Sequence, residues 1–300
     1  MFELRRLRLL HELAMRGTLA AVAEALSYSP STISQQLAQL EKDAGVPLLI
    51  ADGRRVRLTE HGVALAAHAS RALELEEQIR GELESLQPGI APVRVAVLQT
   101  AAQAILPRAL TLLAEREPTL RVEIAEVPPE EGLFELSARG FDLVIAEQYP
   151  GHTRAHRLGL ERETLGSDPI RLALPPADGA RGLTDLRERA WVMEPAGTAA
   201  RQWAVQQCRA AGFEPDIRFE IADLTAQVRL IAEGRAVGVL PDLVWADLDP
   251  PVRLLELPGD PVREIFTAAR ASSVARSGIR EVREALRDAF AARSMTRTLR

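Results

Sequence analysis

Cysteine is nearly absent from this sequence: Cys208 is the only one in 300 residues. A single cysteine cannot form an internal disulfide, which suits the reducing cytoplasm. Long apolar runs are also missing, and none approaches the ~20 residues that a membrane-spanning helix needs. The opening residues MFELRRLRLLHEL are interrupted by charge and lack the apolar core of a signal peptide. We therefore expect a cytoplasmic protein that is not held in a membrane.

Catalytic signatures are missing too. The sequence contains no P-loop, no GxSxG motif and no cysteine–histidine pairing in an obvious context. His152 and His156 have the i, i+4 spacing that can hold a metal on a helix, but no acidic or cysteine ligand lies close to them. We interpret them as a solvated pair in a loop. We therefore expect no cofactor, no metal and no enzymatic activity.

A general excess of positive charge is absent. The net charge of −5 excludes a generally basic protein that coats nucleic acid without sequence preference. Lys42 is the only lysine. The distribution is uneven, because eight basic and six acidic residues fall in residues 1–58, a net charge of +2, which leaves −7 for the remainder. A positively charged N-terminal segment on an otherwise acidic chain would orient that segment toward DNA.

What the chain does contain is a compact series of helices and turns in residues 18–59. The apolar spacing of Leu19–Leu26 predicts a short helix. After a turn, Ser29 and Pro30 are typical of a helix start, and a second helix is predicted to run to about Asp43. This arrangement predicts a helix-turn-helix.

The outer face of the second helix is polar, mostly uncharged and short in side chain, so it can lie close to base edges in the major groove. A glutamine can pair with adenine through two hydrogen bonds, and a serine or threonine can bond a base or a phosphate. The contacts expected from this helix and from the caps of the two helices are Thr18, Ser29, Ser31, Thr32, Ser34, Gln35, Gln39 and Lys42.

A two-stranded wing is predicted next. Asp52-Gly53 is a strong hairpin-turn signal. Three arginines, Arg54, Arg55 and Arg57, gather at the tip and edge of this hairpin, where phosphate contact is natural. A helix-turn-helix shape alone also occurs as core packing in enzymes, but together with the hairpin and its arginines it favours DNA binding.

This stretch resembles the N-terminal domain of LysR-type transcriptional regulators. The matching residues are Ala20-Ala21-x3-Ala25-Leu26, Ser29-x4-Ser34-x2-Leu37-x2-Leu40-Glu41, Gly45-Val46-Pro47-Leu48 and Arg57-Leu58-Thr59-x2-Gly62. Four positions depart from the family pattern. Pro30 stands where glutamine is frequent, Gln35 where arginine is common, Leu49 in place of phenylalanine, and Ala51 in place of an arginine. These departures affect which bases and phosphates are contacted.

A long helix is predicted from Thr59 to about Leu86, before the Pro- and Gly-rich boundary at residues 88–92. Its apolar residues follow alternating four- and three-residue steps, as in a coiled-coil seam: Leu65, Ala69, Ala72, Ile79, Leu83 and Leu86. The alternative is a helix packed on its own chain. We favour a dimer interface because a lone helix between two domains has little else to bury its stripe, and the resemblance implies the same use.

From residue 93 onward, strand-length apolar runs alternate with helices, one of them expected to be continuous from Thr100 to about Glu115. This pattern predicts two α/β lobes. The resemblance implies a doubly wound, two-lobed domain like a periplasmic binding protein, with crossings near Gln148–Leu158 and Leu257–Glu264. The predicted divisions are a winged helix-turn-helix domain at 1–58, a linker helix at 59–88 and an effector-binding domain at 92–300, with lobe I at about 92–148 and 265–300 and lobe II at about 158–262.

Ligands of such sheets lie beyond the carboxyl ends of the strands, where helix N-termini favour anions. Three strand–helix junctions qualify, and by resemblance the first two match effector positions of the family. With two further residues that could line the cleft, the candidates are Gln99, Thr100, Val127, Glu147, Gly197, Thr198 and Asp223. The alternative for the junction residues is ordinary helix capping, above all for Asp223. We expect a small carboxylate or other anion as effector.

The sequence thus predicts a ligand-responsive transcription factor that binds a pseudo-palindromic operator in double-stranded DNA as a homodimer or homotetramer. One alternative is a constitutive or protein-partner-controlled regulator with a vestigial cleft. A less favoured one is an α/β enzyme with an appended helical domain, which would need a cluster of perturbed acids or bases in the cleft.

Overall fold

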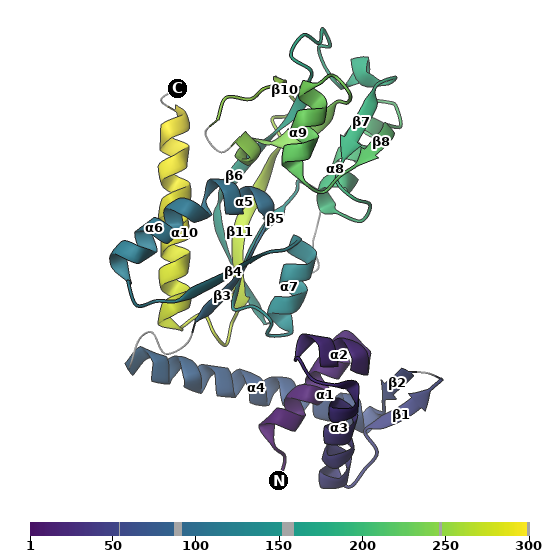
Figure 1. The fold of residues 1–300 in the computed structure, drawn as a ribbon, viewed down its shortest axis with the longest axis vertical. Coiled ribbons are helices and arrows are strands. Elements are labelled where there is room, and N and C mark those ends of the chain that lie inside the picture. The colour runs from purple at the N-terminus through teal and green to yellow at the C-terminus, as the bar shows by residue number, and fades with distance from the viewer. Residues whose placement is uncertain (54, 87–91, 152–158, 246–247, 299–300) are drawn as a thin grey trace.

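The computed structural model describes residues 1–53, 55–86, 92–151, 159–245 and 248–298. Three parts follow one another along the chain: an N-terminal helical head, one long helix, and a larger body of two lobes (Figure 1). In the described part of the chain, no helix combines the length and the apolar character needed to span a bilayer. His152 and His156 lie outside the described residues.

The head is a winged helix-turn-helix. Its elements are α1 (Leu4–Arg16), α2 (Leu19–Ala25), α3 (Pro30–Ala44) and the antiparallel strands β1 (Leu49–Asp52) and β2 (Arg55–Leu58). The expected caps are present, because the Thr18 Oγ1 atom accepts a hydrogen bond from Ala21 N at 3.2 Å and the Ser29 Oγ atom accepts one from Thr32 N at 3.1 Å. One apolar core joins these elements to the start of the next helix.

The long helix α4 (Glu60–Leu86) has two different halves. In the first half, Ala66, Ala69 and Leu73 are buried against the head. In the second half, a row of large apolar side chains remains exposed: Leu75, Ile79, Leu83 and Leu86. The predicted seam is therefore divided, with its first part packed on its own chain and its second part uncovered.

Lobe I is built on strands β3 (Val93–Val97), β4 (Val122–Glu126), β5 (Leu143–Gln148) and β11 (Val262–Arg270). Strand β3 pairs in parallel with β4 and β5, whereas β11 is antiparallel to β5. Alternate residues of β3 face opposite sides, so that Val93, Val95 and Val97 join a core with the helices α5 (Gln99–Ala104), α6 (Leu106–Arg116) and α10 (Ser277–Thr298). Ala96 joins the other core, beneath α7 (Pro129–Ser137).

The prediction of one continuous helix from Thr100 is wrong. The chain breaks at Ile105 between α5 and α6, and α5 begins one residue earlier than expected, at Gln99. Pro107 lies in the first turn of α6. Its ring would clash with the carbonyl of residue 103 in a continuous helix, and it has no N–H to donate.

Lobe II contains β7 (Ala190–Met193), β8 (Asp216–Glu220), β9 (Gly238–Pro241), β10 (Arg253–Glu256) and the helices α8 (Ala199–Ala210) and α9 (Leu224–Ala232), with short 3-10 turns at Leu183–Leu186 and Asp242–Trp245. Strands β7 and β8 are parallel. Apolar cores lie on both faces of this lobe, one including α8 and the other α9.

One strand belongs to both lobes. Strand β6 (Leu160–Leu174) pairs with β11 up to Pro169 and with β9 and β10 beyond it. The predicted start of lobe II at about residue 158 therefore differs from the structure, where the sheet changes near residue 169. The strand runs unbroken through Gly166-Ser167-Asp168-Pro169, a cluster typical of turns, so the sequence pattern predicts a break where the structure has one continuous strand.

Candidate DNA-binding surface and effector cleft

The recognition helix α3 has one buried and one exposed face. Ile33, Leu37 and Leu40 are at most 1% exposed and hold the helix against the head. On the opposite face, Ser31, Ser34, Gln35 and Lys42 are exposed, and Thr32 and Gln39 are partly exposed. Because 3.6 residues make one turn, these positions form a single polar surface of the kind that fits a DNA groove.

Several of these polar side chains are already oriented by local hydrogen bonds. The Ser29 Oγ atom lies 2.8 Å from both the Ser31 Oγ and Thr32 Oγ1 atoms. The Gln39 amide donates to Asp43 Oδ1 at 3.0 Å. Thr18 is partly buried as the cap of α2. The local bonds fix the start of α3, and Gln35 is an exposed amide on the same face.

The wing is anchored to the recognition helix by a residue that the sequence analysis did not single out. The Glu41 Oε1 atom accepts hydrogen bonds from Leu48 N at 2.8 Å and Leu49 N at 3.0 Å. Arg57 in β2 is exposed. Arg54 lies outside the described residues, and Arg55 is described only by its strand position, opposite Asp52. Arg57 is thus the wing cation with a described, exposed side chain.

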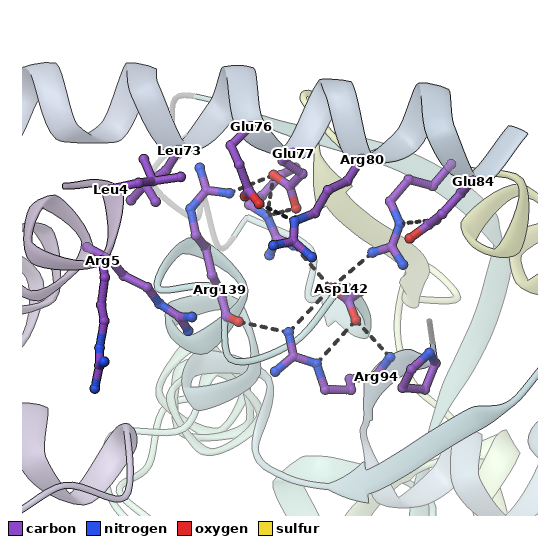
Figure 2. Close-up of a pocket in the computed structure, with 14 residues that line it drawn as sticks. Leu4, Arg5, Leu73, Glu76, Glu77, Arg80, Glu84, Arg94, Arg139 and Asp142 are labelled. Atoms are coloured by element: carbon purple, nitrogen blue, oxygen red, sulfur yellow. Dashed lines mark hydrogen bonds and ion pairs between the residues drawn. The ribbon is translucent and has the colours of Figure 1, made fainter. Parts of the chain in front are cut away.

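The head and α4 are joined to lobe I by ion pairs. The Arg16 guanidinium makes two hydrogen bonds of 2.7 Å to Glu135 at the body and one of 2.7 Å to Glu12 in its own helix. Figure 2 shows Glu76, Glu77 and Arg80 projecting from α4 toward the body, over a cavity of about 490 Å³ that Arg139 and Asp142 also line.

Glu77 is the centre of this cluster. Its carboxylate accepts hydrogen bonds from Arg270 Nη2 at 2.6 Å, Arg139 Nη1 at 2.7 Å and Ser272 Oγ at 2.6 Å. Although burial raises it, the pKa of Glu77 is lowered to about 2, above all by Arg270. Arg270 is itself buried and also donates to the Leu136 carbonyl at 2.7 Å. A buried network of this kind fixes α4 on lobe I.

A second cavity, of about 580 Å³, lies between the two lobes. The ends of strands and the starts of helices from both lobes line it, as expected for sheets of this class. Six of the seven predicted effector residues meet there: Gln99, Thr100, Val127, Glu147, Thr198 and Asp223. Gly197 is exposed and is not part of the lining.

Gln99 bridges the lobes across this cleft. Its amide nitrogen donates to Asp223 Oδ1 at 2.8 Å, and its amide oxygen accepts from Leu224 N at 3.0 Å. Hydrogen bonding to Gln99 lowers the pKa of Asp223. Both Thr198 and Asp223 are N-caps, with bonds from Arg201 N at 3.3 Å and Thr225 N at 2.8 Å respectively. The capping alternative is therefore realised for these two residues, and Asp223 also takes part in the bridge.

Thr100 lines the cavity but does not have the capping role that was the alternative for it. It does not cap α5, whose N-cap is Leu98. Its side chain is fully buried, and its Oγ1 atom accepts a hydrogen bond from Arg263 Nη2 at 2.7 Å. Arg263, which the sequence analysis missed, is 1% exposed, forms an ion pair with Glu147 and donates to Asp168 Oδ2 at 2.9 Å. Although burial lowers it, these carboxylates raise the pKa of Arg263 above its ordinary value.

Glu194 was also missed. It lines the cleft and is partly buried, and burial followed by the charge of Glu147 raises its pKa to about 8. A signal for it existed, because it follows directly after β7, at the carboxyl end of a predicted strand. The enzyme alternative required perturbed acids in this cleft, and Glu194 is such a group. A raised pKa alone does not distinguish a catalytic acid from a binding residue.

Comparisons with known proteins bear on the class of protein. Residues 4–63 match the model of a bacterial regulatory helix-turn-helix protein of the lysR family, and residues 89–291 match the LysR substrate binding domain. The chain is 26% identical to the transcriptional dual regulator GltC of Bacillus subtilis (strain 168), over 83% of each protein. These matches are to transcriptional regulators and not to enzymes.

Solved structures agree in fold. A full-length OxyR variant from Pseudomonas aeruginosa has a TM-score of 0.65 at 21% identity, covering 97% of this chain and 95% of that one. Full-length CbnR complexed with its target DNA has a TM-score of 0.51 at 25% identity, covering 95% of this chain and 100% of that one.

Proposed function

The chain belongs to the LysR family of transcriptional regulators, and from this membership we propose a role for each of its parts. The polar face of α3 enters the major groove of an operator, and the wing contacts the phosphate backbone. A small molecule held between the lobes changes the geometry with which the heads are presented to DNA. Because its target is DNA, the protein would act in the cytoplasm.

The observation that carries this proposal is the division of α3 into a fully buried apolar row and an exposed row of small polar side chains. A core helix would not leave Ser34 and Gln35 exposed side by side with Ser31. Gln35 is assigned to base recognition and Arg57 to phosphate contact, since an amide can match the edge of adenine whereas a guanidinium on the wing is a backbone contact.

The exposed half of α4 supports a homodimer or homotetramer. Its apolar side chains are about half exposed or more: 58% for Leu75, 48% for Ile79, 57% for Leu83 and 82% for Leu86. Ile79, Leu83 and Leu86 follow the spacing of a coiled-coil seam, so a second copy of the same helix would bury them. Two heads joined in this way suit a pseudo-palindromic operator, whose half-sites mirror the two-fold axis of the dimer.

The lobe cavity favours an effector-controlled regulator over one with a vestigial cleft. A volume of about 580 Å³ lies within the range of small-molecule sites. The Gln99–Asp223 bridge also couples the two lobes at the mouth of that cavity, so a ligand can bias the angle between them.

The experiment is fluorescence anisotropy of the purified protein on the DNA upstream of its own coding region, with scrambled DNA of the same length and composition as the control. Measurements at near-physiological salt should give an affinity some 10³-fold or more above that for the scrambled sequence. Equal, steeply salt-dependent binding to both would contradict sequence-specific recognition of that DNA, and selection from a genomic fragment library would then test recognition of any other site.

A further inference from the structure

The helix N-termini at the lobe cavity suggest an anionic effector. The charges of the side chains that line the cavity disfavour one. Among the described residues that line it there is one cation, Arg263, against five carboxyl groups. These are Glu126, Glu130, Glu147, Glu194 and Asp223. A site that gathers acidic groups in this ratio repels a carboxylate and attracts a cation.

Two groups that could hold an anion, Arg263 and the start of α9, are already bound within the protein. Arg263 is buried and surrounded by Glu147, Asp168 and Thr100, so its donors point to protein atoms. At the start of α9, Asp223 places its own carboxylate on the backbone amides, and Leu224 N donates to Gln99. At the start of α8, Thr198 accepts from Arg201 N. The amides at the start of α9 are therefore satisfied without a ligand, whereas Thr198 satisfies one amide of α8 and α5 has no side-chain cap.

Glu194 is a partly buried carboxyl group of the cavity that lacks such a partner. Within the described residues its carboxyl oxygens make no hydrogen bond and no ion pair, although its backbone carbonyl accepts one from Arg201. The charged and titratable groups that surround it come from four elements and the end of β5: Glu147, Glu130, Arg263, Arg201 and Tyr149. Burial, followed by the negative charge of Glu147, raises the pKa of Glu194 to about 8, which favours its protonated form at neutral pH.

The remaining walls of the cavity are apolar. They are formed by Leu98, Val127, Pro128, Pro195 and Leu224. Such walls suit an alkyl or aryl group and offer no hydrogen bonds for a sugar or a polyol. The cavity thus combines a carboxyl group without a partner with a surface for a hydrocarbon body.

We propose that the effector is an organic ammonium compound whose cationic group binds Glu194 beside Glu147 and whose alkyl or aryl body lies against these apolar walls. This inference rests on the proposed function, since it names the ligand class of the same cleft. On binding, the ammonium group favours the carboxylate form of Glu194, so the proton of that carboxyl group passes to solvent. Binding below the pKa of Glu194, about 8, therefore releases up to one proton and strengthens as pH rises toward that value.

The test is isothermal titration calorimetry of the full chain with three probes of matched shape: 2-phenylethylamine, 2-phenylethanol and 3-phenylpropionate. We expect the amine to bind at least tenfold more tightly than the alcohol and the carboxylate to bind least. At pH 7, titrations in two buffers of different ionisation enthalpy should reveal proton release with the amine. Between pH 6 and 8 the affinity for the amine should rise by up to tenfold per pH unit.

Glu194→Gln keeps the size and polarity of the side chain and removes its charge. We expect it to lower the affinity for the amine at least tenfold and to abolish proton release. The control is Glu188→Gln, the same change at an exposed position of the same lobe, which should leave both unchanged. Tighter binding of the carboxylate, or no amine binding at 10 mM, would overturn the inference. Sequence-specific operator binding in the same preparation would show that the proposed function stands independently of that outcome.

Discussion

Glu77→Gln should detach the second half of α4 from lobe I. The carboxylate of Glu77 is 10% exposed and bound by Arg270, Arg139 and Ser272. The lowering of its pKa from 4.5 to about 2 corresponds to roughly 3 kcal/mol of favourable interaction in the folded protein. Removing the charge also leaves the buried Arg270 with Asp142 as its other carboxylate and takes the anion from the partly buried Arg139; loss of one partner costs about 3–5 kcal/mol in buried pairs.

The assay is amide hydrogen exchange along α4, because local opening can be measured there without assuming that the protein unfolds in one step. A loss of about 3 kcal/mol should speed exchange in the second half of α4 by roughly a hundredfold at neutral pH. In the wild type, the pKa is lower in the folded state, so this stabilisation is complete above pH 4.5 and declines as pH falls toward about 2.

The matched control is Glu76→Gln, the same change on the adjacent residue. Glu76 pairs with Arg80, whose side chain is 70% exposed, and such surface pairs contribute about 0–1 kcal/mol. Exchange in this variant should stay within a few-fold of the wild type. If Glu77→Gln and Glu76→Gln gave the same exchange rates, the assignment of Glu77 as the residue that holds α4 on the body would be refuted.

Three further outcomes are expected. Gln35→Ala should cost about 1–3 kcal/mol of discrimination at one operator position. Arg57→Ala should weaken binding to all sequences and reduce the slope of log affinity against log salt concentration by about one, which anisotropy at several salt concentrations measures. Equal effects of both changes on every sequence would contradict these roles. Ile79→Glu combined with Leu83→Glu should place charges in the exposed seam and yield monomers by multi-angle light scattering, and an unchanged mass would exclude this seam as the interface. Gln99→Ala should remove the bridge between the lobes and give a larger radius of gyration by small-angle X-ray scattering, so an unchanged profile would show that the bridge does not set the lobe angle.

The head could be predicted almost completely from the sequence because its signals are local. Ser29, Pro30 and Gly45 determine the ends of one helix through a cap, a fixed φ and a left-handed residue at φ 69°. The break at Ile105 was also encoded locally, by Pro107, and was overlooked because the apolar spacing continues across it. The path of β6 through both sheets was not encoded locally, since it depends on which strands pair with each half.

The sequence predicted where the residues of the cleft lie, but it did not predict the net charge of the side chains that line it. The rule that ligands lie beyond strand ends located Gln99, Thr198 and Asp223 correctly on one cavity. That rule does not say which cations are already paired. Arg263 is separated from Glu147 by 116 residues in the sequence, and from Thr100 by 163. A contact between such distant positions has no periodicity or spacing that a single sequence displays, so the neutralisation of the one buried cation became visible only in the fold.

The positions of Arg263 and Arg270 on one strand constrain how a ligand can act on the head. Both lie in β11, whose central residues Ile265 and Phe266 are fully buried, so the cleft and the contact with α4 are joined by a rigid element. Among the described residues, the ion pairs from the head and α4 to the body, including those through Glu135, Arg139 and Arg270, involve lobe I. Closure of lobe II onto lobe I within one chain therefore leaves these contacts unchanged. In the proposed oligomer, we infer that a response at the DNA depends on a contact between lobe II and a neighbouring subunit, because only a contact that differs between the open and closed states can shift the equilibrium between them.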